Sequence, residues 1–141
     1  MKKVILLAGP TASGKSDLAI FLAKKIDGEI INADSMQVFK EIKILSARPN
    51  KYNGIKHHLY GFLTVKKNFS TGEWLRLVEK KVTQIIRKKK TPIIVGGTGL
   101  YFKSLLSGLA KIPSITQTQR QKISSLYNKI GNKEFYKKYF T

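Results

Sequence analysis

One glycine-rich loop constrains the fold of this chain more than any other segment. Gly9-Pro10-Thr11-Ala12-Ser13-Gly14-Lys15-Ser16 follows a mostly apolar run at residues 3–8 and precedes a segment with helical spacing. This is the pattern G-x-x-x-x-G-K-[ST], in which loop amides and the N-terminus of the next helix surround a phosphate. In such a P-loop the Lys15 ammonium reaches the outer phosphate oxygens, and the Ser16 hydroxyl binds a Mg²⁺ ion. The sequence therefore predicts a site for a phosphate or diphosphate.

The segments around the loop predict a parallel sheet flanked by helices. Residues 3–8, 29–33 and 93–95 are short apolar runs, as expected of strands that are buried on both faces. The helix that follows the loop ends at Asp27-Gly28, and its expected apolar side holds Leu18, Ala19, Leu22, Ala23 and Ile26. Strand, loop, helix and strand in this order open a βαβ unit. The predicted fold class is therefore α/β, a P-loop NTPase-like parallel sheet flanked by helices.

Further helices follow in the second half of the chain. Ser70 and Glu73 have the spacing of a capping box, and the helix behind them should run to about Lys90. Its predicted buried face holds Trp74, Val78, Val82, Ile85 and Ile86. Residues 100–107 and 117–129 predict two more helices, and Gly131 turns the chain into a basic, aromatic tail. Residues 37–67 lack clear periodicity and predict loops with short helices.

The chain reads as a single domain over residues 1–141, because neither a repeat nor a low-complexity linker divides it. Three strands are few for an open sheet, which usually has about four to six. We therefore expect the sheet to be incomplete on its C-terminal side.

The amino-acid composition limits the classes of binding partner and of site that the chain can have. Lys+Arg 27 against Asp+Glu 8 gives a formal net charge of +19, which favours polyanions, although a general lysine bias accounts for it equally well. With Cys 0, the chain forms neither disulfides nor thiolate metal sites. No apolar run is long enough to span a bilayer, and Gly9-Pro10 ends the first one too early for a signal peptide. We expect a cytoplasmic protein with no membrane partner.

Two further segments should meet the P-loop, because ligands bind at the carboxyl ends of the strands in open α/β sheets. Asp34 ends the second strand and is a candidate general base or a Mg²⁺ ligand through water, or else a turn residue. Gly96-Gly97-Thr98-Gly99 ends the third strand, so Thr98 should face the same ligand. His57-His58 lacks acidic or Cys partners at zinc spacing, which favours a structural or RNA-facing role. Trp74, at helical spacing, should lie in the core.

These segments together resemble the tRNA dimethylallyltransferase (isopentenyl transferase) family. The resemblance lies in residues 9–16, in Ile31-Asn32-Ala33-Asp34-Ser35-Met36-Gln37-Val38-Phe39, in Gly96-Gly97-Thr98-Gly99-Leu100-Tyr101 and in His57-His58-Leu59, and it extends through Arg120. It implies transfer of a dimethylallyl group from dimethylallyl diphosphate to the exocyclic amine of an adenine beside the tRNA anticodon. The P-loop, residues Gly9 to Ser16, would then hold pyrophosphate rather than split ATP.

The resemblance also implies roles for single residues. Asp34 would take the proton from the adenine amine, and Ser35, Met36 and Gln37 would line the pocket for the flipped base. Thr98 would hydrogen-bond the bridging or leaving oxygen, with Lys15 and Mg²⁺ at the diphosphate. Arg120 matches an arginine that contacts tRNA.

The chain departs from the family pattern in several places. Phe39 stands where Tyr is usual, Ser46-Ala47-Arg48-Pro49 replaces a more common Thr-Ala-Lys-Pro, and Tyr60 lies near a usually acidic position. Thr141 comes before the later helices and an inserted helical domain of the family. We therefore expect a monomer that by itself binds diphosphate weakly and transfers no dimethylallyl group to tRNA at a useful rate; whether a complementing C-terminal chain supplies the missing part is left open by the sequence.

Two other functions share parts of this pattern. A small-molecule or nucleotide kinase would use the same P-loop for ATP, but it usually has several arginines over the transferred group, and this chain has only Arg48, Arg76, Arg87 and Arg120. A basic RNA-binding remnant would keep the charge without catalysis. Binding driven by phosphates alone would weaken steeply with salt and would not prefer an unmodified anticodon loop.

Overall fold

Alternation of side chains along parallel strands gives this molecule a core on both faces of one sheet. The computed structural model describes residues 3–49, 52–110 and 115–140. Its strands are β1 (Ile5–Ala8), β2 (Gly28–Asn32), β3 (His57–His58) and β4 (Thr91–Gly96), all parallel, in the spatial order β1-β4-β2-β3. Ile30 pairs with Ile93, and Ile31 pairs with Ile94. Because successive residues point to opposite faces, each pair enters a different half of the core.

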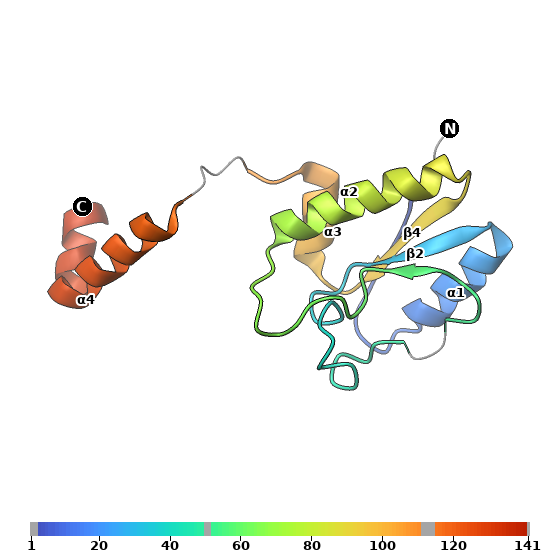
Figure 1. The fold of residues 1–141 in the computed structure, drawn as a ribbon, viewed down its shortest axis with the longest axis horizontal. Helices are drawn as coiled ribbons and strands as arrows, with labels where there is room; N and C mark the ends of the chain where they lie inside the picture. Colours follow the sequence, from blue (N-terminus) through green and yellow to red (C-terminus); the bar gives the residue numbers. More distant parts are fainter. Residues whose placement is uncertain (1–2, 50–51, 111–114, 141) are drawn as a thin grey trace. The chain divides into compact units, whose positions relative to one another are not determined.

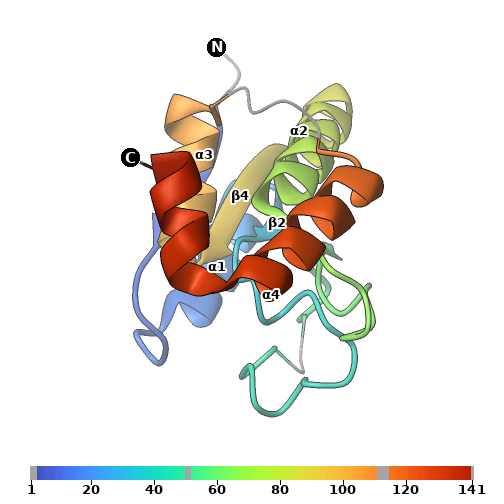
Figure 2. The ribbon, with the colours of Figure 1, turned by 90° about the vertical axis from the view of Figure 1, so that its left-hand side faces the viewer.

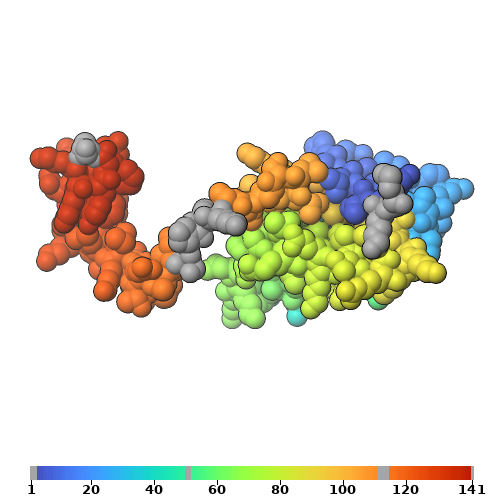
Figure 3. Space-filling model, turned by 90° about the horizontal axis from the view of Figure 1, so that it is seen from above, coloured from blue at the N-terminus to red at the C-terminus, as the bar shows by residue number. Residues whose placement is uncertain are grey.

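Three helices cover the two faces (Figure 1). Helix α1 (Lys15–Lys25) packs on the face of Ile30 and Ile93. Helices α2 (Thr71–Arg87) and α3 (Gly99–Ser107) pack on the opposite face, around Ile31 and Ile94. In the space-filling view α2, green to yellow, and α3, orange, lie side by side (Figure 3). This three-layer arrangement confirms the predicted α/β class.

The buried side of α1 differs from the prediction. Ala19, Ile20 and Ala23 are buried, whereas Leu18 and Ile26 are 47% and 38% exposed. The two alanines let the helix approach the sheet closely, so the contact stripe is centred on them rather than on the leucines. Apolar spacing along the helix was ambiguous here because hydrophobic residues occur on more than one of its sides.

Strand β3 was not predicted. Two residues are too few to show a period, and the strand exists because His57 and His58 pair with Ile30 and Ile31 of β2. The imidazole Nε2–H of His58 also donates to Glu29 Oε2 at 2.6 Å, and Lys88 Nζ lies 3.6 Å from Glu29 Oε1. The two histidines thus extend the sheet to four strands, one more than expected.

Helix α2 begins as the sequence predicts. Ser70 Oγ accepts from the Glu73 amide at 3.2 Å, and Glu73 Oε2 accepts from the Ser70 amide at 2.8 Å, which completes the capping box. Trp74, Val78 and Ile85 are buried, and Val82 and Ile86 are half-buried. The helix ends at Arg87 instead of near Lys90, because Lys89 adopts a left-handed turn (φ 62°) and Thr91 already belongs to β4.

Residues up to 109 form one compact unit, and the described residues from 110 onward form a second. Helix α4 (Gln117–Phe140) has no buried residue and bends at Gly131, whose φ of 76° and ψ of 169° are not helical (Figure 2). The tail beyond Gly131 is therefore helical, contrary to the prediction, since glycine accommodates the bend and Phe135 contacts Tyr127 and Tyr139 around it. Among the described helices, none combines the length and apolar character that a bilayer span requires.

The hydrogen-bonded pair of His58 in β3 and Glu29 in β2, together with the neighbouring His57, makes the stability of the fold depend on pH. Burial lowers the pKa of His58 below its ordinary 6.5, an effect larger than the increase that Glu29 causes. Burial also lowers the pKa of His57. For Glu29, burial by itself raises the pKa, but the hydrogen bond from His58 and the charge of Lys88 outweigh it, so the pKa lies below its ordinary 4.5.

We expect the free energy of unfolding to fall on acidification from about pH 7.5 to 5.5. The unfolded chain protonates both histidines near their ordinary pKa of about 6.5, while the folded chain resists protonation, so acid favours unfolding; Glu29 adds a further loss below about pH 4.5. Urea unfolding at several pH values measures this. The double variant His57→Gln/His58→Gln should flatten the change between pH 7.5 and 5.5, and a parent whose stability rises with acid would contradict the argument.

Candidate active site

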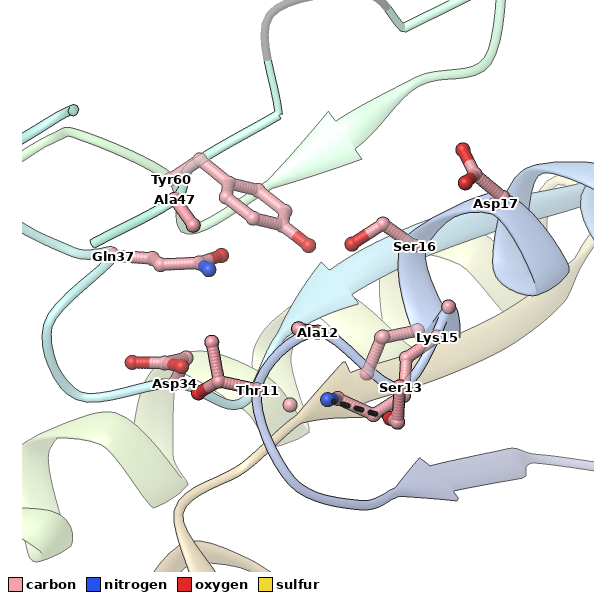
Figure 4. Close-up of a pocket in the computed structure, with 13 residues that line it drawn as sticks. Thr11, Ala12, Ser13, Lys15, Ser16, Asp17, Asp34, Gln37, Ala47 and Tyr60 are labelled. Atoms are coloured by element: carbon pink, nitrogen blue, oxygen red, sulfur yellow. Dashed lines mark hydrogen bonds between the residues drawn. The ribbon is translucent and has the colours of Figure 1, made fainter. Parts of the chain in front are cut away.

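The P-loop and the ends of β2 and β4 line one cavity of about 320 Å³ (Figure 4). It lies at the carboxyl edge of the sheet, where the sequence predicted that these segments would meet. Its lining residues are Thr11, Ala12, Ser13, Gly14, Lys15, Ser16, Asp17, Asp34, Gln37, Ala47, Tyr60, Val95 and Gly96. The structure thus brings Lys15, Ser16, Asp34 and Gln37 together.

Backbone conformation turns the P-loop into the start of α1. Ala12 and Gly14 have positive φ values of 63° and 76°, and the Gly9 amide donates to the Gly96 carbonyl at 3.3 Å, which ties the loop to β4. The Ser13 hydroxyl donates to the Pro10 carbonyl at 2.8 Å. The Lys15 ammonium donates to the same carbonyl and to Ser13 Oγ, so it lies against its own loop (Figure 4). The loop has the curvature and the positive charge that an anion site requires.

A buried asparagine holds Asp34 at the cavity. Asn32 is fully buried; its Nδ2 donates to the carbonyls of Asp34 (2.9 Å) and Leu59 (3.0 Å), and its Oδ1 accepts from the Asp34 amide at 2.9 Å. Asp34 Oδ1 in turn accepts from the Met36 amide at 2.9 Å. These bonds fix both the backbone and the carboxylate of Asp34. This role of Asn32 was not predicted, although a polar residue in an apolar strand is a visible signal in the sequence.

Three of the predicted residues do not line the cavity. Thr98 Oγ1 accepts from the Ser35 amide at 2.9 Å and lies 3.3 Å from Ser35 Oγ, so Thr98 supports the loop that carries Asp34. Neither Thr98, Ser35 nor Met36 lines the cavity, and Met36 is 53% exposed. Gln37 does line it, with its Nε2 donating to the Ser46 carbonyl at 2.9 Å. Arg120 lies on α4, in the second compact unit.

The remaining candidates have structural contacts. Trp74 is in the core as predicted: it is fully buried, stacks on Tyr101 with ring centroids 4.1 Å apart, and donates from Nε1 to the Asn32 carbonyl at 2.9 Å. His58 belongs to the sheet through its bond with Glu29. Tyr60, two residues further, lines the cavity, and burial raises the pKa of its phenol, with Tyr52 and Asp34 adding to the effect.

The model of the IPP transferase family matches residues 37–140, well over half of the chain. The chain belongs to the IPP transferase family. The tRNA dimethylallyltransferase of Pelagibacter ubique is 61% identical over 138 residues, and that of Rickettsia bellii is 50% identical over 137. Each alignment covers 96% of this chain but 44% of the relative, so this IPP transferase chain spans less than half the length of the curated relatives it matches.

Solved structures agree with this assignment. The full-length tRNA isopentenylpyrophosphate transferase from Bacillus halodurans superposes with a TM-score of 0.76 at 30% identity, covering 93% of this chain and 44% of that one. A eukaryotic dimethylallyltransferase acting on tRNA gives a TM-score of 0.78 at 34% identity, covering 92% and 35%. Both structures carry the names of transferases that act on tRNA, as the curated relatives do.

Gly96 shows why the family motif at the end of β4 needs glycine here. A Cβ built on Gly96 would lie 2.1 Å from the carbonyl carbon and oxygen of Ala33, the residue before Asp34. A Cβ on Gly99, three residues later, would meet nothing within 4 Å. Of Gly96 and Gly99, packing therefore requires glycine only at Gly96.

We therefore expect Gly96→Ala to lower the free energy of unfolding by at least about 2 kcal/mol, because backbone rather than a flexible side chain must move. Gly99→Ala is the matched control and should be neutral or slightly stabilising, since alanine is the better helix former. Urea unfolding of the two variants beside the parent measures both effects. Equal stability of the two variants would show that the contact between β4 and Ala33 is not tight.

Proposed function

We propose that this chain serves the transfer of a dimethylallyl group from dimethylallyl diphosphate to the exocyclic amine of an adenine next to the tRNA anticodon. The observation that carries the proposal is the joint placement of the P-loop and Asp34 on one cavity, in a chain 61% identical to a tRNA dimethylallyltransferase. The net charge of +19 suits a tRNA partner, and the cytoplasm is where we expect the protein to act.

The P-loop wall would hold the diphosphate. Amides of residues 11–16 and the N-terminus of α1 favour anions, and the Lys15 ammonium has only to turn from the Pro10 carbonyl to reach a phosphate oxygen. Mg²⁺ fits this wall, because the Ser16 hydroxyl and the Asp34 carboxylate are hard oxygen donors on the same cavity. Ser16 would hold the ion together with phosphate oxygens, where it would add positive charge beside the leaving group.

The Asp34 wall would activate the adenine. As the bond between the allylic carbon and the bridging oxygen breaks, pyrophosphate leaves with the electron pair, and a new bond forms between that carbon and the amine nitrogen. The nitrogen then loses a proton, and Asp34, held by Asn32 and the Met36 amide, is placed to accept it. Gln37 on the cavity, Ser35 and Met36 beside it, and Thr98 behind them would position the base; Arg120 would contact the tRNA.

Diphosphate binding should depend on Lys15. Lys15→Ala should weaken pyrophosphate binding at least ~10-fold, or about 1.4 kcal/mol, because loop amides cannot replace the charge of the ammonium. Isothermal titration calorimetry with Mg²⁺ present measures the affinity. Lys24→Ala, at the far end of α1, serves as the control and should bind as the parent does. Equal affinity of Lys15→Ala and the parent would contradict the P-loop assignment.

Prenyl transfer should depend on Asp34. The chain is incubated with dimethylallyl diphosphate, Mg²⁺ and unmodified tRNA, alone and with the C-terminal part of the Pelagibacter ubique relative, and the nucleosides are analysed. Asp34→Asn should lower isopentenyl-adenosine formation by about 100-fold or more, yet bind pyrophosphate nearly as well, because its Oδ1 still accepts from the Met36 amide.

Asp27→Asn is the control for the loss of one carboxylate, since Asp27 is exposed and pairs with Lys90 at 2.8 Å. It should transfer at the rate of the parent. Full activity of Asp34→Asn would exclude Asp34 as the base. If no mixture forms the product and tRNA binding simply weakens with salt, without preference for the unmodified loop, the RNA-binding alternative holds instead.

A further inference from the structure

Tyr60 places a phenol on the cavity from the segment that follows β3. The ring lies 6.4 Å from Tyr52 and 5.6 Å, edge-on, from His57, measured between centroids. It also packs against the core cluster between α1 and the sheet. These contacts hold the ring, and Figure 4 shows its hydroxyl directed toward the P-loop and the first turn of α1.

The phenol oxygen has no partner within the part of the chain that the structure describes. Its hydrogen bonds therefore go to whatever occupies the cavity that it lines. Burial raises the pKa of Tyr60, and the nearby charge of Asp34 raises it further, so the group keeps its proton at neutral pH. A protonated phenol offers one O–H donor to the cavity.

The direction of this donor suggests its acceptor. It points toward the wall formed by Lys15, Ser16 and the loop amides, the wall that favours anions. The other polar side chain beside it, Gln37, already uses its Nε2 on the Ser46 carbonyl. A neutral donor also suits a place close to the Asp34 carboxylate, where a second ammonium would pair with that carboxylate and compete for it.

Building on the proposed function, we propose that the Tyr60 hydroxyl donates a hydrogen bond to a phosphate oxygen of the diphosphate held by the P-loop. Tyr60 would thus close the diphosphate site from the side opposite the loop. Because charge grows on the pyrophosphate as the allylic carbon–oxygen bond breaks, the same hydrogen bond would strengthen along the reaction.

Pyrophosphate binding tests this assignment without any need for turnover. Calorimetry with Mg²⁺ present compares the parent with Tyr60→Phe, Tyr52→Phe and Lys15→Ala. Tyr60→Phe removes one oxygen and keeps the ring, so its thermal midpoint should match that of the parent while its affinity falls about 10-fold. Tyr52→Phe is the matched control: Tyr52 packs beside His57 but does not line the cavity, so its affinity should not change. Affinities are measured at a temperature where every variant is fully folded.

The outcomes separate this inference from the function on which it rests. Parent-like affinity in Tyr60→Phe together with weakened Lys15→Ala would overturn the role of Tyr60 and leave the P-loop assignment intact. The same holds if Tyr60→Phe binds pyrophosphate normally but binds unmodified tRNA more weakly, which would place the phenol at the adenine. A parent that does not bind pyrophosphate would overturn both proposals.

Discussion

The close contact between the ends of β2 and β4 is the constraint on which the site depends. The Ala33 amide donates to the Val95 carbonyl at 2.7 Å, and Gly96 lies so close to Ala33 that no side chain fits between them. The Gly9 amide then donates to the Gly96 carbonyl. Both functional loops therefore leave the sheet from one point, so that a loop built for anions and a loop that carries a carboxylate share a cavity instead of lying at separate edges.

The buried Asn32 carries this constraint into the site. A buried amide is costly unless its hydrogen bonds are made, and Asn32 makes them to both sides of Asp34 and to Leu59. Trp74 adds a bond to the Asn32 carbonyl from the opposite core. One hydrogen-bond network thus connects Asp34, helix α2 and the start of the segment that leads to Tyr60. The role proposed for Asp34 as a base needs such fixed placement, because small displacements are costly in rate.

The two walls of the cavity suit the proposed reaction, in which a charged group leaves while a neutral amine is activated. Lys15 and the loop amides offer positive potential on one wall, and Asp34 offers a proton acceptor on the other. In the structure the Lys15 ammonium lies against Pro10 and Ser13 of its own loop. The membership of the chain in the IPP transferase family agrees with this arrangement of the two walls.

Local chemistry alone determined much of this protein. The sequence alone predicts the P-loop, the capping box at Ser70, the burial of Trp74 and the α/β order of the elements, because each depends on residues close together in the chain. Tertiary structure decided the rest. The two-residue strand β3 exists only through pairing with β2, and the buried side of α1 depends on how closely Ala19 and Ala23 approach the sheet. Asn32 bonds to Leu59, and Tyr60 lines the cavity, only because distant segments meet. Such contacts join residues dozens of positions apart, and no local period encodes them.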